Sequence, residues 1–114
     1  MDLTPALVDR LVSRLFADEL RPAASALLAR YGIESYEREV VRVRVATLKL
    51  CEGSLERLES AVVAAKRDYR DVLAWAEYPD EMRQFTWRLP AEEQTRIHQA
   101  DRMQYHAWLA EHGE

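Results

Sequence analysis

The chain has 114 residues, of which 20 are acidic and 16 are basic, so its formal net charge at pH 7 is -4. Hydrophobic residues make up 48% and charged residues 32% of it, a balance that excludes a disordered chain and is typical of a folded domain. The acidic balance disfavours bulk nucleic-acid binding, for which a basic domain is expected. The length predicts one domain over residues 1–114, large enough to bury a core without metals or disulfides.

The expected compartment follows from the single cysteine and from the missing targeting signals. Cys51 has no second cysteine with which to form an internal disulfide, and a lone cysteine suits a reducing compartment. The first residues, M-D-L-T-P, lack the charged and then apolar leader of a signal peptide. No uninterrupted apolar run approaches the ~20 residues that span a bilayer. These observations predict a cytoplasmic protein without membrane contact.

The first 30 residues predict two helices. Thr4 and Pro5 form a strong helix start, because Thr caps helix N-termini and Pro is favoured at the first helical position. A wide apolar stripe follows at helical spacing: Leu7, Val8, Leu11, Val12, Leu15 and Phe16. Arg21-Pro22 ends or kinks this helix. A short Ala-rich segment follows over 22–30, and Gly32 is well placed to stop it.

The segment 34–52 carries two conflicting signals. Its run V-R-V-R-V, residues 41–45, alternates with period two and is β-branched, which is typical of a strand. The alternation fails at Ala46, however, and a single strand would have no partner. Acidic residues at positions 34, 37 and 39 and Lys49 near the far end match the dipole of a helix. We therefore predict a helix over about 37–51.

The stretch Gly53–Pro79 predicts one long helix over about 54–77. Ser54 supplies an N-cap and Pro79 a stop. One apolar seam runs through it at alternating three- and four-residue steps: Leu55, Leu58, Val62, Ala65, Tyr69, Val72 and Ala76. Because the connection to the preceding helix is short, the two helices should form an antiparallel hairpin.

The last third of the chain predicts a connector and a final helix. Residues 80–89, which include Phe85 and Trp87, are expected to form a packed connector. Leu89-Pro90 then begins a helix that runs to about His112. The complete prediction is an all-α domain of four to five helices around the central hairpin.

One block resembles a run found in short uncharacterised bacterial proteins. It is A-K-R-D-Y-R-D-V-L-A-W-A-E-Y-P, residues 65–79, and the segment 42–53 is similar in character. This resemblance implies a bacterial origin and an all-α domain. It implies no activity, so no functional residue is transferred from it.

The polar and aromatic residues at the end of the long helix are the candidates for binding a partner. Its charged run indicates a solvated face with a pair between Arg67 and Asp71, or alternatively Asp68 and Arg70 reaching another helix or a protein. The aromatic residues of the second half suit a core or a protein–protein surface. The partner-binding candidates are Asp68, Arg70, Trp75, Glu77 and Tyr78.

Patterns for catalysis and metal binding are missing from the sequence. There is no G-x-S-x-G, no Gly-rich phosphate loop and no H-E-x-x-H. His98, His106 and His112 do not pair at i,i+4, so no metal site is predicted. Cys51, at a helix end beside Glu52, should have a raised thiol pKa and is a poor nucleophile. We predict no catalytic residue and no cofactor.

Three functions are weighed on these observations. The leading one is a non-catalytic bacterial interaction module that binds a protein or self-associates as a homodimer. The alternative is a small enzyme or ligand-binding helical domain with a pocket at Asp68, Tyr69, Arg70 and Glu77. A second alternative is a regulator that binds nucleic acid.

The nucleic-acid alternative depends on a short basic stripe. Arg38, Arg42 and Lys49 are expected near one helix face, with Arg44 close by. Acidic residues interrupt the stripe, so a solvated face explains it better and nucleic-acid binding is disfavoured.

Overall fold

The computed structural model describes residues 2–114, so Met1 of the expected 1–114 domain lies outside the described residues. Within them the chain forms seven α-helices and two short 3-10 helices, and no strand. The elements in chain order are α1 (Pro5–Leu15), η1 (Asp18–Leu20), α2 (Arg21–Ala29), α3 (Val40–Cys51), α4 (Leu55–Arg67), α5 (Tyr69–Glu77), α6 (Pro79–Gln84), η2 (Thr86–Arg88) and α7 (Ala91–Gly113). The all-α prediction is confirmed, although the helices outnumber the four to five expected.

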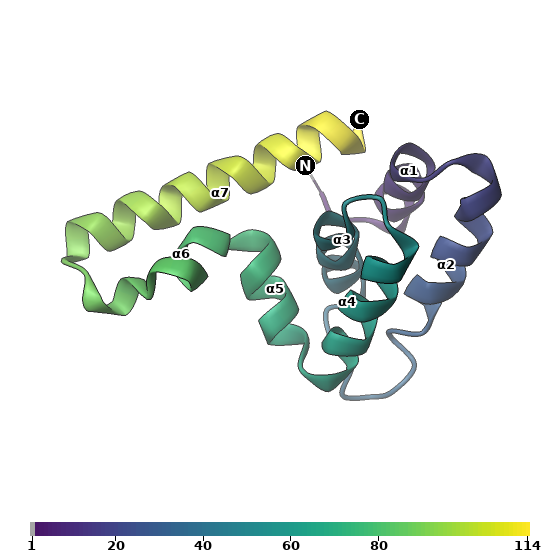
Figure 1. Ribbon diagram of the computed structural model, residues 1–114, viewed down its shortest axis with the longest axis horizontal. Coiled ribbons are helices and arrows are strands. Elements are labelled where there is room, and N and C mark those ends of the chain that lie inside the picture. The colour runs from purple at the N-terminus through teal and green to yellow at the C-terminus, as the bar shows by residue number, and fades with distance from the viewer. Residues whose placement is uncertain (1) are drawn as a thin grey trace.

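Helices α1 to α5 enclose the apolar core, which the end of α7 also touches (Figure 1). The expected start of α1 is confirmed, because the Thr4 hydroxyl accepts a hydrogen bond of 3.2 Å from the Leu7 N–H. Ten apolar side chains are completely excluded from solvent: Leu7, Leu11, Ala24, Val43, Val45, Ala46, Leu48, Cys51, Leu58 and Ala76. Burial of this apolar surface supplies most of the stabilising free energy.

Helix α3 settles the conflict between helix and strand at 34–52. It packs against α1, α4 and α5, so apolar residues on several of its faces are buried. The strand-like alternation arises from two arginines with polar partners. Arg42 pairs with Glu77 of α5, and Arg44 Nη2 donates to the Tyr31 carbonyl oxygen at 2.8 Å. The two arginines of the alternating run therefore bind polar partners on different parts of the chain, and the run does not form a β-strand.

The start of α3 lies at Val40, three residues later than predicted. Glu39 has the left-handed backbone (φ 54°), and Glu37 lies in the preceding loop as a buried loop anchor. Glu37 Oε1 accepts hydrogen bonds from the N–H groups of Gly32, Ile33 and Glu34, at 2.9–3.1 Å. Its other oxygen lies 2.7 Å from Lys66 Nζ of α4. The acidic residues expected to favour the helix dipole therefore include one that shapes a loop instead.

A tight turn joins α3 and α4 as the expected hairpin. Glu52 and Gly53 are both left-handed (φ 49° and 77°), which reverses the chain within three residues. The Ser54 cap is confirmed, since its hydroxyl accepts from the Arg57 N–H at 3.2 Å. Cys51, just before the turn, is fully buried and its Sγ donates to the Leu48 carbonyl oxygen at 3.1 Å. Burial, more than its acidic neighbour, raises the pKa of this thiol.

The single long helix predicted over 54–77 is wrong, because the chain breaks at Asp68. This residue is extended (φ -158°, ψ 102°), and it ends α4 and begins α5. Its carboxylate accepts from the Arg70 N–H at 3.1 Å, an N-cap that competes with continuation of the helix. The apolar seam survives the break, since Leu58 and Val62 on α4 and Val72 and Ala76 on α5 are all buried.

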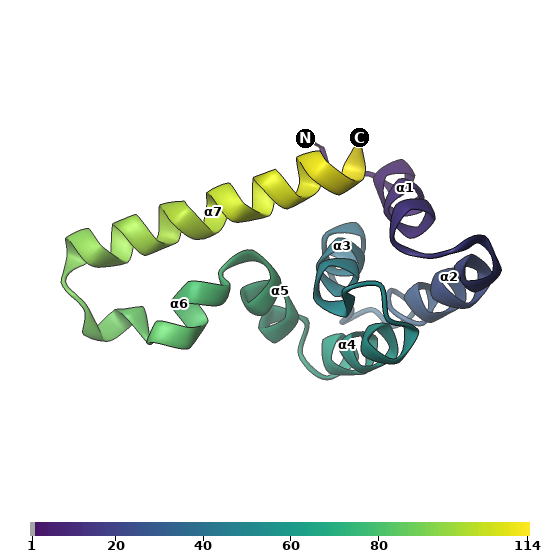
Figure 2. The same cartoon turned by 45° about the horizontal axis from the view of Figure 1, so that its top comes forward.

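The predicted connector at 80–89 contains α6 and η2 instead. Pro79 begins α6 at its first position, and Phe85 ends it with a left-handed backbone (φ 49°). We call residues 79–103, which comprise α6, η2 and the first half of α7, the arm. Figures 1 and 2 both show the arm extending away from α1 and α2, and the molecule measures 47 × 30 × 24 Å.

Polar contacts hold the two sides of the arm together, and an aromatic stack ties the arm to the end of α5. Asp101 of α7 is completely buried, and its two oxygens accept from the N–H groups of Asp80 (3.1 Å) and Glu81 (3.0 Å) at the start of α6. The Tyr78 and His98 rings stack with centroids 4.8 Å apart. Within the arm, Ile97 is the one buried apolar side chain. The arm therefore has almost no apolar core of its own.

Candidate functional site

The five partner-binding candidates do not form one cluster. Asp68 and Arg70 pair with each other at 3.1 Å, as part of the α5 cap. Glu77 is buried, and Tyr78 lies under His98. Trp75 is the aromatic candidate that faces solvent, with 42% of its surface exposed.

The break at Asp68 also changes the expected ion pairing. The ion pairs of the described residues include no contact between Arg67 and Asp71, because these two residues now belong to different helices. The ion pair that forms here joins Asp68 to Arg70 instead. The Arg70 side chain remains 77% exposed, so the pair contributes little stability.

The buried Glu77 links α5 to α3 through Arg42. The two side chains form a forked ion pair, with Arg42 Nε donating to Glu77 Oε2 at 2.8 Å and Nη2 donating to Oε1 at 2.6 Å. The hydrogen bonds to Glu77 hold the pKa of Arg42 above its usual range. Arg42 is therefore committed to an internal partner and is not a free cation for a phosphate.

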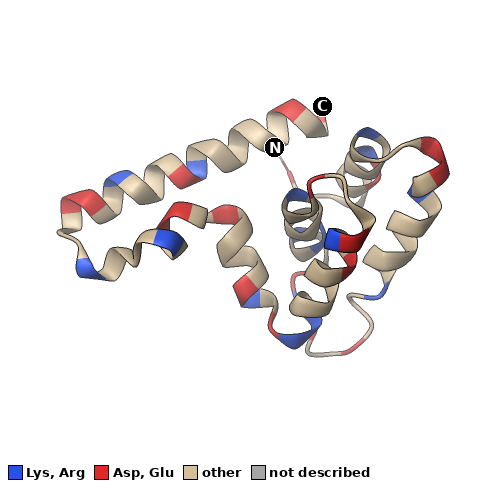
Figure 3. Ribbon diagram, viewed as in Figure 1, with Lys and Arg blue, Asp and Glu red and all other residues tan. Residues whose placement is uncertain are grey.

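The rest of the predicted basic stripe is also not assembled on one face. Arg38 lies in the loop before α3, where its carbonyl oxygen accepts from the Tyr31 hydroxyl at 2.6 Å. Lys49 lies at a separate hollow of about 360 Å³, which Trp108 and Leu48 also line, and burial lowers the pKa of its ammonium group. Basic and acidic residues are intermixed along the ribbon (Figure 3), so this geometry does not favour nucleic-acid binding.

Two adjoining hollows lie at the residues of the predicted ligand pocket. One, of about 220 Å³, is lined by Asp68, Tyr69 and Arg70 together with Tyr36 and Glu37. The other, of about 380 Å³, is lined by Tyr69, Arg70, Glu77 and neighbours on α3 and α5. The four residues of that alternative therefore border concave surface, but they divide it into two hollows.

A third hollow, of about 170 Å³, also borders the Arg42–Glu77 pair. Its walls come from α3, from the junction of α5 with α6 and from α7: Arg42, Glu77, Tyr78, Arg102, Tyr105 and His106. The sequence interpretation missed the α7 contribution. The signal was present as spacing, because Arg102, Tyr105 and His106 are three and four residues apart and so share one helix face.

Two exposed aromatic side chains lie at the tip of the arm. Phe85 is 59% exposed and Trp87 is 69% exposed, whereas both were expected in a packed connector. Phe85 ends α6 with a left-handed backbone (φ 49°), and neither ring belongs to the buried core. The Arg88 guanidinium lies over the Trp87 ring, with Cζ 4.6 Å from the ring centroid.

Neither a metal centre nor a membrane-spanning helix is present among the described residues. Residues 2–114 contain no group of three histidine, cysteine or carboxylate side chains that could hold a metal ion. None of the described helices has the length and apolar character needed to cross a membrane.

Comparisons with protein-family models, with curated proteins and with solved structures found no match. The resemblance of residues 65–79 to short bacterial proteins stays a prediction.

Proposed function

We propose that this chain is a non-catalytic interaction module that binds a protein partner through the tip of its arm. The observation that carries the proposal is the exposure of Phe85 and Trp87 on a projecting element. The setting that we propose is the cytoplasm of a bacterium, from the lone cysteine and the resemblance of residues 65–79.

The tip has the composition of an interface anchor. Tryptophan, phenylalanine and arginine are enriched in protein–protein interfaces, and tryptophan and arginine dominate their binding energy. Trp87 and Arg88 already lie one over the other, which orders both side chains before a partner arrives. Trp75 on α5 is a further exposed aromatic side chain.

The backbone of Phe85 gives independent support. A bulky residue with positive φ is uncommon and costs about 1 kcal/mol or more relative to glycine. Phe85 accepts this cost while leaving its ring in solvent, so the folded chain alone gains little from having phenylalanine there. A partner that covers the ring would supply the missing gain.

Two substitutions at the tip separate binding from folding. Phe85→Gly removes the ring and relieves the strained backbone, so it should leave stability unchanged or raise it. Trp87→Ala removes an exposed ring and should change the free energy of unfolding by less than about 0.5 kcal/mol. Both variants should lose the partner in affinity capture from the native host.

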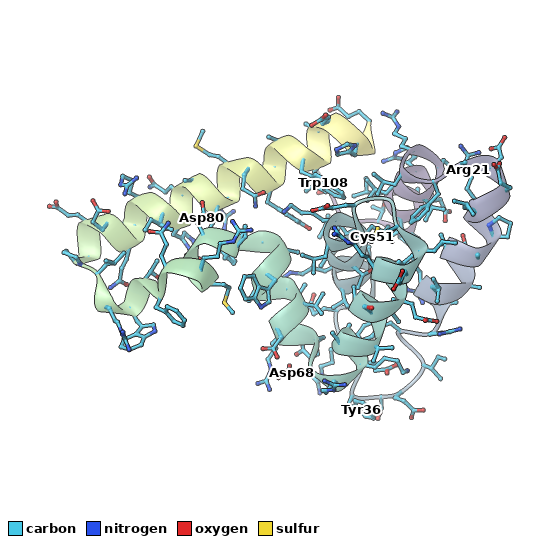
Figure 4. All side chains as sticks on the ribbon, viewed as in Figure 1. Arg21, Tyr36, Cys51, Asp68, Asp80 and Trp108 are labelled. Carbon is cyan, nitrogen blue, oxygen red and sulfur yellow. The ribbon has the colours of Figure 1, made fainter. Side chains whose placement is uncertain are left out.

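The matched control is Tyr36→Ala, which removes an equally exposed ring (64%) from the loop before α3, beyond the arm (Figure 4). This variant should recover the partner at the wild-type level. Recovery of the same partner by Phe85→Gly and Trp87→Ala would refute binding through the tip. Light scattering after size exclusion, over a range of concentrations, tests whether the partner is a second copy of the chain.

The second candidate function is ligand binding at the hollows beside Tyr69 and Arg70. Its support is that Asp68, Tyr69, Arg70 and Glu77 all line one or both of these hollows. Replacing Tyr69 by Phe and Arg70 by Gln should then weaken a ligand found by screening with thermal shift. If the wild type and the double variant respond identically to every compound, this function is wrong.

A further inference from the structure

The hollow of about 170 Å³ lies where the arm joins the core. Arg42 on α3 and Glu77 at the end of α5 form one wall, and Arg102, Tyr105 and His106 on α7 form the other. The hollow involves none of the residues of the aromatic tip, Phe85, Trp87 and Arg88. An inference drawn from it goes beyond the proposed function.

Tyr105 has a buried hydroxyl group without a partner. The residue is only 8% exposed, and its hydroxyl oxygen forms no hydrogen bond within the described residues. A buried hydroxyl that leaves water without gaining a partner costs free energy, and such groups are rare in folded proteins. Burial and the nearby Glu77 carboxylate raise the pKa of Tyr105, so its hydroxyl keeps its proton and can donate it in a hydrogen bond.

The charges around this hydroxyl favour an acceptor that is negative. Arg42 and Glu77 neutralise each other across 2.6 Å. Arg102 forms no ion pair among residues 2–114, and His106 adds a ring nitrogen that can donate. The residues that carry one guanidinium without an ion pair, one buried hydroxyl and one imidazole therefore line the same hollow.

We propose that this hollow binds a small oxyanion, the carboxylate or phosphate group of a ligand, through Tyr105 Oη, Arg102 and His106. The oxyanion accepts from the Tyr105 hydroxyl, which completes the missing hydrogen bond, and it neutralises Arg102. The Glu77 carboxylate stays paired with Arg42, so it does not repel the ligand as a free charge would.

The test is a titration followed by NMR of the full chain at constant ionic strength. Acetate and inorganic phosphate are the two probes, one for each source of the oxyanion. Backbone amides at 102–106 and the His106 ring resonances should shift in a saturable way. The probe that saturates at the lower concentration identifies the source.

Two variants and a control assign the binding to the hollow. Tyr105→Phe keeps the ring and removes the hydroxyl, and Arg102→Gln removes the charge; each should weaken binding at least about tenfold, the usual loss for a hydrogen bond to a charged group. Arg96→Gln, on the exposed surface of the same helix, should bind as the wild type does. The amide spectrum of each variant verifies folding.

Each other outcome overturns the proposal. Metabolites are typically present at about 1 mM or less, so the titration runs to about 20 mM. If neither probe gives a saturable shift up to that concentration, the hollow does not bind an oxyanion. Equal weakening by Arg96→Gln means that the anion follows the general charge of α7. Unchanged binding in folded Tyr105→Phe means that the buried hydroxyl is not a ligand-binding group.

Discussion

The core, α1 to α5, and the arm, residues 79–103, are stabilised by different interactions. The core buries ten apolar side chains completely, on helices that each touch at least one other core helix. The arm buries one apolar side chain, Ile97; Asp101 ties its two sides together, and the stack of Tyr78 on His98 ties it to the end of α5. Hydrophobic burial acts over the whole core, whereas each tie of the arm is one directional contact. The difference implies that the arm can open while the core stays folded.

The largest effect is expected from a core leucine. Leu58→Ala removes a completely buried side chain at the packed surface of α4 and should lower the free energy of unfolding by about 3 kcal/mol, through lost burial and a residual cavity. Urea denaturation measures it. The matched variant in the arm is Ile97→Ala, which should leave the global midpoint almost unchanged and increase amide exchange in 79–103. Equal global losses would mean that arm and core unfold together.

A smaller effect is expected from Glu37, a polar contact on the core side. Burial alone would raise the pKa of this carboxyl, but the hydrogen bonds from Lys66 and from three backbone N–H groups lower it from 4.5 to about 2. A lowered folded-state pKa stabilises the protein above pH 4.5, and this contribution is lost as the pH falls toward 2. Glu37→Gln should therefore cost about 2 kcal/mol at pH 7 and almost nothing at pH 2.

The control for that measurement is Glu59→Gln, which breaks an exposed pair with Arg30. It should change the free energy of unfolding by less than about 0.5 kcal/mol at either pH. A Glu37→Gln loss that does not depend on pH would show that the carboxylate charge is not what the loop requires.

Asp101 tests the arm directly. Asp101→Ala removes both acceptors that cap α6 and should cost about 1.5 kcal/mol, confined to the arm. Hydrogen exchange should show lost protection over 79–84 with protection of α3 unchanged. Asp101→Asn keeps one carbonyl oxygen and should give an intermediate result. Lost protection of α3 would contradict the independence of the two regions.

The smallest effect is expected at the break between α4 and α5. Asp68→Ala removes an N-cap and should lower stability less than Asp101→Ala does, because the packed seam on either side holds both helices in place. Asp71→Ala, an exposed acid in the first turn of α5, should cost only about 0.3 kcal/mol through the helix dipole. Thermal unfolding of the two variants compares them. A larger loss of stability in Asp71→Ala than in Asp68→Ala would show that Asp68 is not the residue that caps α5.

The sequence predicted the apolar faces better than the helix boundaries. Period and composition predicted the seam from Leu58 to Ala76 correctly, because burial depends on spacing that a one-residue break does not disturb. The break itself depends on whether the Asp68 carboxylate bonds the next N–H groups or faces solvent. Nothing as decisive as a glycine or proline stands there to decide it.

The sites were harder to predict because they are assembled across the chain. Arg42 meets Glu77 over 35 positions, and Asp101 meets Asp80 over 21. Exposure of Phe85 and Trp87 depends on a backbone turn that leaves no mark in the apolar pattern. The candidates at 68–78 were chosen by proximity in sequence, whereas their contacts differ: Asp68 pairs with Arg70, Glu77 with Arg42, and Tyr78 stacks on His98.

The reactivity of Cys51 can be used to measure how often the core opens. As the one thiol in the chain, fully buried on α3, it can react with a disulfide reagent only after the helices around it separate. The rate of labelling therefore counts openings of the core and ignores motions of the arm, which contains no thiol. A spectrophotometer and one colorimetric reagent are enough to time how often the folded interior becomes accessible to solvent.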